Sequence, residues 1–535
     1  MRIIRIFPRW VARTFLPWVL MGLMAAVASF SAVGEDAVAV QYHFAGAANL
    51  AKGPNFSTAS GILRAPSSAG YESLVLDRLS RVFWRDLKFS AGGSPTNVLR
   101  PLLEDLWQAE SVGSFGANPI DLSFVVAARL DKARAEVWQK NLETAMSGKG
   151  ASFAAESFNG SRWDNGFWLV RANDWVVVGR GEGLSSVRRD YLQQLQKSGR
   201  PWPALDKQCF QAVIDFPLLS GNGDSHVIPL KPARTTVDIT ASGNRFHVNA
   251  FLSYAEAAVW SPQPWRIPKE LVRQPLTSFT AAQGIEPYLQ FSDVFSRLAT
   301  DPFTNQFYCW AQKEMPFESY MAWPVNNASN VLQDIGNKEL VILNPLLSKR
   351  DNSQLTWSSA SHQIGWTKSA IMRPFIRAST EKEGDFLFAG LFDPHEGNPP
   401  APADLWAQFE SRSDLVYYNW ELTSLRVHQW RLFAEMLPML APVSGHGPAQ
   451  TDKKTPLPYV AVENWLAGME FALGNTVTEV TRTSPDELTV TRSAPLVFTG
   501  LELVWLSYWL ADVPAAPFNM NLMPKAKISG PGAPH

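Results

Sequence analysis

Hydrophobic residues along this chain follow two spacings, one typical of strands and one typical of helices. The β-favouring runs Phe167–Val170 and Trp175–Val178 flank the turn-forming group Ala172–Asp174, so this stretch predicts a hairpin. Apolar residues then recur three or four positions apart, which indicates a helix with one buried face: Leu184, Val187, Tyr191 and Leu195. Because the strands arrive mostly as hairpins, the sequence predicts an α+β fold with mainly antiparallel sheets and helices packed on one face. A doubly wound nucleotide-binding sheet is disfavoured.

The same succession of elements occurs twice. The first passage consists of an opening segment (44–50), a helix (71–84), a strand with a following helix (123–142), a hairpin (167–178), a helix (184–195), a strand (210–216) and a second hairpin (237–254). The second passage repeats this order at 279–285, 294–299, 319–332, 371–391, 405–409, 414–420 and 477–491. Asp131 and the pair Asn326-Asn327 occupy corresponding places between a strand and a helix. There a short polar side chain can accept backbone N–H groups of the first helical turn.

We therefore predict an internal duplication, with two similar halves at residues 35–265 and 266–512, each a mainly antiparallel sheet with helices on one face. Identity between the passages is low, and chance recurrence of such elements in an α+β chain is the alternative. The second half carries inserted helices at Thr423–Leu440 and Val460–Leu473. The stretches 220–234, 393–403 and 442–458 have the Pro-, Gly- and Ser-rich composition of loops.

The end of the chain combines a helix with a polar tail. The helix is expected to start at Thr499, which with Glu502 has the spacing of a reciprocal capping box. Its apolar run is too short to cross a membrane and predicts a core helix. Residues 513–535 are expected to form a disordered tail.

Residues 1–34 are expected to be a signal peptide or an N-terminal membrane anchor. Four arginines, the last of them Arg13, precede the uncharged stretch Phe15–Val33, and no further Lys or Arg occurs before Lys52. Small residues at Ala26–Ala28 and Ala32–Gly34 suit a signal peptidase, whereas the length of the apolar stretch also suits an uncleaved anchor. The body is thus expected to be exported, and to be periplasmic, secreted or anchored to the membrane by this segment.

Charge and composition exclude some partners. Forty-eight basic and 49 acidic side chains leave a net charge of −1, so no overall field attracts nucleic acid or anionic lipid. Membrane contact is therefore expected only through the N-terminal segment. The 46% hydrophobic and 18% charged residues indicate a large buried interior, and 535 residues predict more than one domain.

The two cysteines, Cys209 and Cys309, rule out a disulfide scaffold. Both lie in apolar, strand-like runs, which favours two buried thiols. One bridge between them, in an oxidising compartment, is the alternative.

Motifs for metal, cofactor and nucleophile chemistry are missing. The chain has no His-Glu-x-x-His, no Cys-x-x-Cys and no Gly-x-Ser-x-Gly pattern, so we predict no metal site, no cofactor and no catalytic residue. His428 is expected on the polar side of a helix and His247 inside a hairpin, as ordinary surface or packed histidines. Ser379–Lys382 has Ser-x-x-Lys spacing, but it falls in a predicted hairpin turn and not at a helix start.

Two further patterns have a structural interpretation. Gly179–Gly183 joins a strand to a helix, yet it has no Walker lysine, and Glu182 would repel a phosphate, so a glycine-eased turn is expected. Asp215 and Glu421 lie near the ends of corresponding strands, and carboxylate pairs serve glycoside hydrolysis. Because Asp215 aligns better with Asn419, we expect a repeated capping or turn role there.

Tryptophan is abundant, with 21 residues, and indole faces can stack on sugars. Packing is the favoured explanation, because most occupy positions that look core-facing, among them Trp84, Trp138, Trp175, Trp505 and Trp509.

The two-unit body behind a leader, with the segments Leu122–Val126 and Asp414–Glu421, resembles a group of large exported bacterial proteins of unknown function. The resemblance spans most of the body. It implies a duplicated α+β architecture outside the cytoplasm and brings no known catalytic residues to this chain.

The leading hypothesis is an exported periplasmic or envelope protein that is not an enzyme and that binds or scaffolds an unknown protein, small molecule or glycan, in a groove between the halves. The alternative is an exported hydrolase acting on glycans through a site without a sequence motif. A third hypothesis is an anchored, lipid-associated factor. Two convergent, unpartnered carboxylates would favour the enzyme, whereas an exposed apolar or aromatic patch would favour a binding protein.

Overall fold

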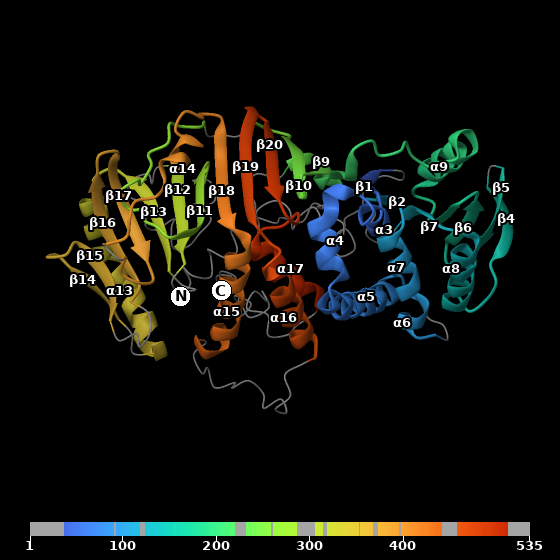
Figure 1. Cartoon of the computed structure of the whole chain (residues 1–535), viewed down its shortest axis with the longest axis horizontal. Helices are drawn as coiled ribbons and strands as arrows, with labels where there is room; N and C mark the ends of the chain where they lie inside the picture. Colours follow the sequence, from blue (N-terminus) through green and yellow to red (C-terminus); the bar gives the residue numbers. More distant parts are fainter. Residues whose placement is uncertain are drawn as a thin grey trace, which may run out of the picture.

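The computed structural model describes residues 37–511, apart from 90–92, 118–122, 156, 220–231, 258–260, 286–304, 314–317, 352–353, 368–372, 395–396 and 441–456. Its β-rich parts form one long sheet (Figure 1), in which every strand pairing of the described residues is antiparallel. The α+β class predicted from the hairpins is therefore confirmed.

The first ten strands are β1 (Val38–Phe44), β2 (Ser111–Gly116), β3 (Phe124–Arg129), β4 (Ala151–Ala155), β5 (Phe158–Arg162), β6 (Phe167–Ala172), β7 (Trp175–Arg180), β8 (Gln208–Asp215), β9 (Pro232–Ser242) and β10 (Arg245–Tyr254). The helices among them are α3 (Ala47–Leu50), η1 (Pro54–Phe56), α4 (Ser57–Arg64), α5 (Pro66–Asp86), α6 (Pro95–Val98), α7 (Arg100–Gln108), α8 (Lys132–Ala145), α9 (Ser185–Ser198) and α10 (Phe216–Leu219).

The later strands are β11 (Leu276–Gln283), β12 (Gln306–Gln312), β13 (Ser319–Val325), β14 (Gln354–Ser358), β15 (Gln363–Thr367), β16 (Phe375–Glu381), β17 (Gly384–Gly390), β18 (Leu415–Leu422), β19 (Asn475–Ser484) and β20 (Glu487–Ala494). Their helices are α13 (Ala328–Asp351), α14 (Ala403–Ala407), α15 (Thr423–Leu440), α16 (Leu457–Glu470) and α17 (Gly500–Ala511).

The pairings place the strands in a single line. From one end the order is β4-β5-β6-β7-β3-β2-β1-β8-β9-β10, and it continues as β20-β19-β18-β11-β12-β13-β17-β16-β15-β14. The first and second sets of ten strands meet where β10 pairs with β20 over Phe246–Ser253. We had expected a sheet for each half, and the structure instead has one continuous sheet.

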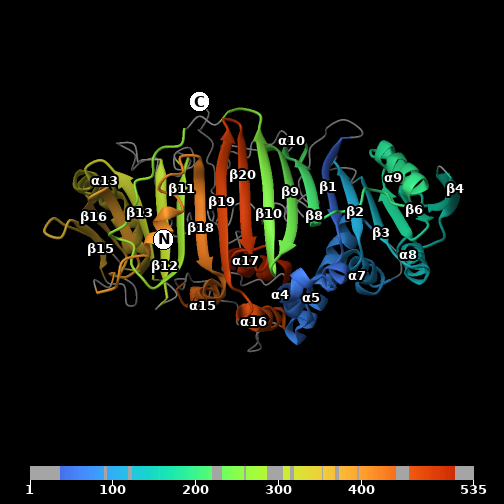
Figure 2. The same cartoon turned by 45° about the horizontal axis from the view of Figure 1, so that its top comes forward.

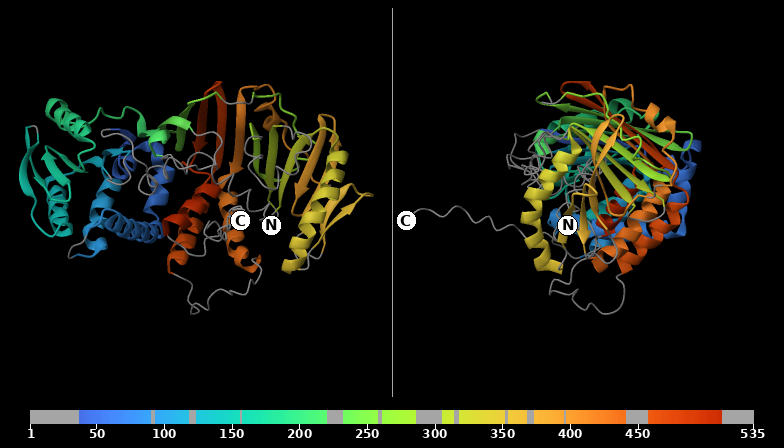
Figure 3. Two further views of the ribbon diagram at one scale, coloured as in Figure 1. Left: turned by 180° about the vertical axis from the view of Figure 1, so that it is seen from behind. Right: turned by 90° about the vertical axis from the view of Figure 1, so that its left-hand side faces the viewer.

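A layer of helices covers one face of the central strands. Figures 1 and 3 show α5, α15, α16 and α17 gathered on the same side of the sheet. Helix α5, from the first part of the chain, packs against α16, where the rings of Tyr71 and Trp465 stack 4.2 Å apart and the Trp465 Nε1–H donates to Ser68 Oγ at 3.0 Å. The helical layer therefore joins residues almost 400 positions apart.

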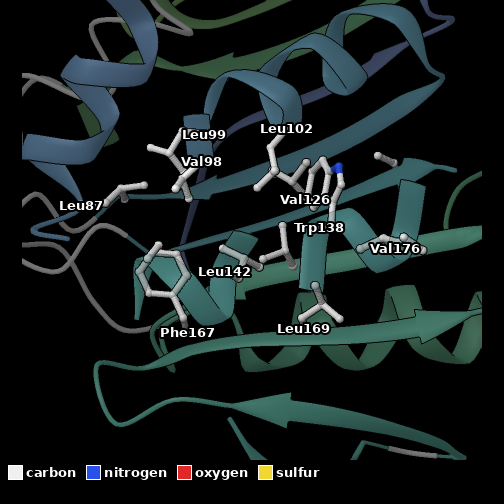
Figure 4. Packing of buried hydrophobic residues seen from close by; sticks show 14 of the residues in the cluster. Leu87, Val98, Leu99, Leu102, Val126, Trp138, Leu142, Phe167, Leu169 and Val176 are labelled. Atoms are coloured by element: carbon white, nitrogen blue, oxygen red, sulfur yellow. The ribbon is translucent and has the colours of Figure 1, made fainter. Parts of the chain in front are cut away.

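Helices lie on both faces at the ends of the sheet, so the prediction that they pack on one face is wrong there. In β3, Val126 packs in a cluster with Trp138 of α8, as seen in Figure 4, while its neighbours Val125 and Ala127 pack with Leu192 of α9. Since successive side chains of a strand point to opposite faces, α8 and α9 cover opposite sides. At the other end of the sheet α13 and α14 pack in two separate hydrophobic clusters, so they also cover opposite faces.

Capping signals predicted the starts of three helices correctly, whereas α5 and α16 begin five and three residues before their predicted starts. Asp131 accepts the Arg134 N–H at 2.8 Å at the start of α8, and Asn327 accepts the Asn330 N–H at 3.2 Å at the start of α13. Thr499 and Glu502 bond each other's backbone N–H groups at 3.3 and 2.8 Å, which confirms the capping box of α17.

Other details differ from the prediction. Asn419 lies within β18 and accepts from Thr280 Oγ1 at 2.9 Å, so it caps no helix. Arg234, expected in a loop, belongs to β9. The hairpins β4–β5 and β14–β15 were not predicted, because their strands have five residues each and little hydrophobic alternation. The leader 1–34, the helix 294–299 and the tail 513–535 lie outside the described residues.

Candidate functional site: the polar face of the central strands

The paired-carboxylate hypothesis can be tested directly on the sheet. Asp215 ends β8 and Glu421 lies in β18, and five strand-to-strand steps separate these strands. At about 4.8 Å per step the two strands are about 24 Å apart, far beyond the roughly 5–10 Å between the carboxylates of glycosidases. The two carboxylates also lie on opposite faces of the sheet. Ile214, the residue before Asp215, packs in the core on the helix side, so Asp215 points to the other side, whereas Glu421 accepts a hydrogen bond from helix α17. Their carboxylates therefore cannot act on one substrate.

Glu421 instead belongs to a buried network under the central strands. Its Oε1 accepts the Gly500 N–H at 2.7 Å, and burial raises its pKa. Beside it, Arg492 of β20 makes two bonds to Glu502 of α17, at 2.7 and 3.1 Å, and both side chains are buried. These contacts hold the first turn of α17 against the sheet.

A second buried polar cluster lies in the first part of the chain. The buried His43 Nε2 of β1 is 3.0 Å from Glu110 Oε1, and Arg200 bonds the same oxygen. Burial raises the pKa of Glu110, but His43 and Arg200 lower it more, so the net pKa is below its usual value. A histidine–carboxylate pair is a common general base. This carboxylate also bonds Arg200, however, so it joins β1 to the segment after α9.

The remaining predicted residues have ordinary roles. His247 bonds Ser242 Oγ at 2.9 Å, and His428 lies on the half-exposed side of α15, 3.1 Å from Glu470. The Ser379–Lys382 spacing falls at the β16–β17 turn, as predicted. In the Gly179–Gly183 connection Glu182 pairs with Arg162 at 2.5 Å, which fits a turn.

The cysteines are free thiols, as the favoured interpretation predicted. Cys209 is buried in β8, and Cys309 is partly buried in β12. Burial raises the pKa of each thiol to about 12. Seven strand-to-strand steps separate β8 from β12, and this distance excludes a disulfide between them.

Packing accounts for Trp84, Trp138 and Trp175, which lie in or against buried hydrophobic clusters. Trp138 and Trp175 are buried, as predicted, whereas Trp84, Trp505 and Trp509 are half-buried. Trp509 lies 5.4 Å from the guanidinium of Arg78 on α5, a cation–π contact within the helical layer.

One carboxyl group has a strongly perturbed pKa. Glu381 accepts the Glu270 N–H at 3.1 Å, and its other oxygen is buried with no hydrogen-bond partner among the described residues. Burial, and after it the charges of Glu270 and Glu383, raise its pKa to about 7, against the lowering effects of the Glu270 N–H and Arg273. This group thus titrates near neutral pH.

We expect Glu381 to make the protein less stable as the pH rises. An acid whose pKa is higher in the folded state favours folding when it is protonated, so the free energy of unfolding should fall between about pH 4.5 and pH 7 and then level off. Glu381→Gln should remove this loss and raise stability at about pH 8 by about 1–2 kcal/mol, after allowance for solvent screening. Urea unfolding across this pH range measures it. Glu136→Gln, at an exposed position, is the control, and an unchanged pH profile for Glu381→Gln would contradict the assignment.

The central strands carry a polar surface on the face away from the helical layer. Side chains of β9, β10, β20 and β19 lie opposite one another in three rows. The rows are Thr240–His247–Ser493–Val477, Asp238–Asn249–Thr491–Glu479 and Thr236–Phe251–Thr489–Thr481. All of these side chains are at least partly exposed. Figure 2 shows the four strands side by side.

Six of the twelve side chains in these rows carry a hydroxyl group, and two carry a carboxylate. Asp238 accepts from Gln211 Nε2 at 2.8 Å, and Glu479 pairs with Arg412 at 2.8 Å. Phe251, 42% exposed, stands among the threonines. The surface is thus a hydroxyl-rich polar face with two carboxylates and one exposed aromatic ring. Sequence analysis missed it because the outward positions of each strand are ordinary, and only the pairing of β10 with β20 brings them together.

Among the residues described, no three His, Cys, Asp or Glu side chains are grouped so as to hold a metal ion. Within the described ranges, no helix has the length and hydropathy of a membrane span. No protein-family model and no curated protein matches the chain. Among solved structures, crystal form IV of TP0453 matches at 15% identity and a TM-score of 0.21, covering 43% of this chain and 79% of that chain. Crystal form III matches at 16% identity and the same TM-score, covering 44% and 81%.

Proposed function

We propose that this is an exported, non-catalytic binding protein whose central polar face takes a glycan. The observation that carries the proposal is the hydroxyl-rich polar surface of β9, β10, β20 and β19 around the exposed Phe251. Sugars present hydroxyl groups for hydrogen bonding and C–H faces for aromatic rings, so such a surface suits them.

The duplication belongs to the same proposal. Numbered from its own first strand, each set of ten has the order 4-5-6-7-3-2-1-8-9-10, and the two sets meet through their tenth strands, β10 and β20. Ten strands in the same order are hard to obtain by chance. This supports two similar halves, with the binding face at their junction.

Export rests on the leader. The arginines up to Arg13 followed by the uncharged stretch Phe15–Val33 suit export, and a body outside the cytoplasm would meet envelope glycans. The separation of Asp215 from Glu421 weakens the alternative of a glycan hydrolase that uses this pair.

Glycan binding by purified protein tests the proposal, with two exposed phenylalanines as a matched pair. Phe251 lies on the polar face, and Phe471, 94% exposed, follows α16 in the helical layer. We expect wild-type protein to bind envelope glycans on an array, Phe251→Ala to bind about tenfold more weakly, and Phe471→Ala to bind normally.

Several outcomes would reject the proposed function or a part of it. Absence of glycan binding by the wild type, or equal binding by Phe251→Ala, excludes this face as a glycan site. Release of shorter sugars during the incubation would support the hydrolase instead. Recovery of the protein from the cytosolic fraction of its host would reject export.

A further inference from the structure

The two edges of the sheet are protected to different degrees. An edge strand exposes unpaired backbone N–H and C=O groups, which pair readily with another strand unless they are covered. The edge strands here are β4 and β14, each of five residues and each without a charged residue or proline.

The edge at β14 is capped from within the chain. The side-chain amide of Asn344 on α13 accepts the Leu355 N–H at 2.7 Å and donates to the Leu355 C=O at 2.9 Å. A side-chain amide used in this way replaces both bonds that a neighbouring strand would make to Leu355. Helix α13 also packs along β14.

The edge at β4 has no such cap among the described residues. Among the described strands it pairs with β5 alone, and the side chains of Ser152 and Ala154, which share one face of β4, are exposed. Phe153 and Ala155 point to the opposite face and pack in the cluster under α9, so the strand is held in place with its outer edge free.

We propose that β4 pairs antiparallel with β4 of a second copy of this chain. The segment Ala-Ser-Phe-Ala-Ala is self-complementary, because a two-fold axis at Phe153 sets Ser152 opposite Ala154 and brings no like charges together. The cap on β14 blocks pairing of β4 with β14, which would propagate into a filament. The product is a closed dimer with one sheet running through both copies.

The short edge also sets the strength of the dimer. Five residues bury little surface compared with a stable interface, so the dimer should dissociate on dilution. Sedimentation velocity of purified full-length protein over a wide range of concentrations should reveal a reversible monomer–dimer equilibrium.

Charge at exposed positions tests the pairing without disturbing the core. Ser152→Lys with Ala154→Lys sets lysine opposite lysine across the two-fold axis, and we expect dimerisation about tenfold weaker or lost. Ser152→Glu with Ala154→Glu should do the same. An equimolar mixture of the lysine and glutamate variants should dimerise again, because opposite charges then face each other.

Thr356→Lys with Ser358→Lys, at exposed positions of the capped β14 edge, is the matched control and should dimerise like the wild type. Monomeric wild-type protein at every concentration, or dimers of the lysine variant as tight as those of the wild type, would overturn the proposal. Glycan binding is a separate readout that tests only the polar face.

Discussion

Replacing Arg492 by Met is expected to lower the free energy of unfolding by about 3–5 kcal/mol. Arg492 and Glu502 have side chains only 4% and 3% exposed, and the guanidinium makes two bonds to the carboxylate. Without Arg492 the Glu502 carboxylate stays buried without its main counter-charge, and this cost exceeds that of the lost bonds. Urea unfolding followed by tryptophan fluorescence measures the change.

Two further variants distinguish the cost of the unpaired buried charge from the effect of replacing an arginine elsewhere. Arg492→Met with Glu502→Gln should lose less stability than the two single changes together, because the double variant leaves no unpaired charge. Arg85→Met, which breaks a pair with Asp86 at a side chain 76% exposed, should change stability far less than Arg492→Met. Equal losses of unfolding free energy for Arg492→Met and Arg85→Met would show that the buried pair stabilises the protein no more than the exposed pair does.

Trp138→Ala is expected to cost about 3–5 kcal/mol at the β4 end of the sheet. Trp138 of α8 is 2% exposed and packs among Leu102, Leu142 and Val126 (Figure 4). Its Nε1–H also donates to Asp105 at 2.8 Å. Truncation to alanine therefore leaves a cavity and removes a charge-assisted hydrogen bond.

The controls for Trp138 use a smaller ring and an exposed position. Trp138→Phe keeps much of the packing, so it should cost less than alanine, and Asp105 retains its bonds to Arg134. Trp107→Ala, at a position 38% exposed, should change stability by about 1 kcal/mol at most. A loss at Trp107 equal to that at Trp138 would contradict the assignment of this cluster as core.

The local elements of this fold were well predicted wherever a residue's role depends on its sequence neighbours. Asp131 and Asn327 cap helices, and Thr499 and Glu502 form the capping box, because all of these bonds reach at most three residues along the chain. The turn at Ser242–Asn244 follows the same rule, with Gly243 and Asn244 at positive φ. Asn419 was misassigned because a short polar residue near the end of a run resembles a cap, whereas Thr280, its partner, is 139 residues away.

The candidate site was less predictable than the elements that form it. Phe251 and Thr489 are ordinary strand residues in sequence, and they become neighbours only through the register of β10 with β20. Asp215 and Glu421 look related in sequence, yet the tertiary structure sets them on opposite faces of the sheet. The cap of Leu355 by Asn344 spans 11 residues and has no sequence signal that we recognise.

The sequence by itself determined the α+β class, most of the strands and helices, and the helix caps, because hydrophobic period, turn residues and capping side chains act over one or two turns of chain. Only the tertiary structure decided that both sets of ten strands share one sheet, which face each helix covers and which edge of the sheet is capped. These features depend on which distant strands pair and in what register. Many strands of similar hydrophobicity could satisfy a local pattern equally well, and the packing of the whole chain selects among them.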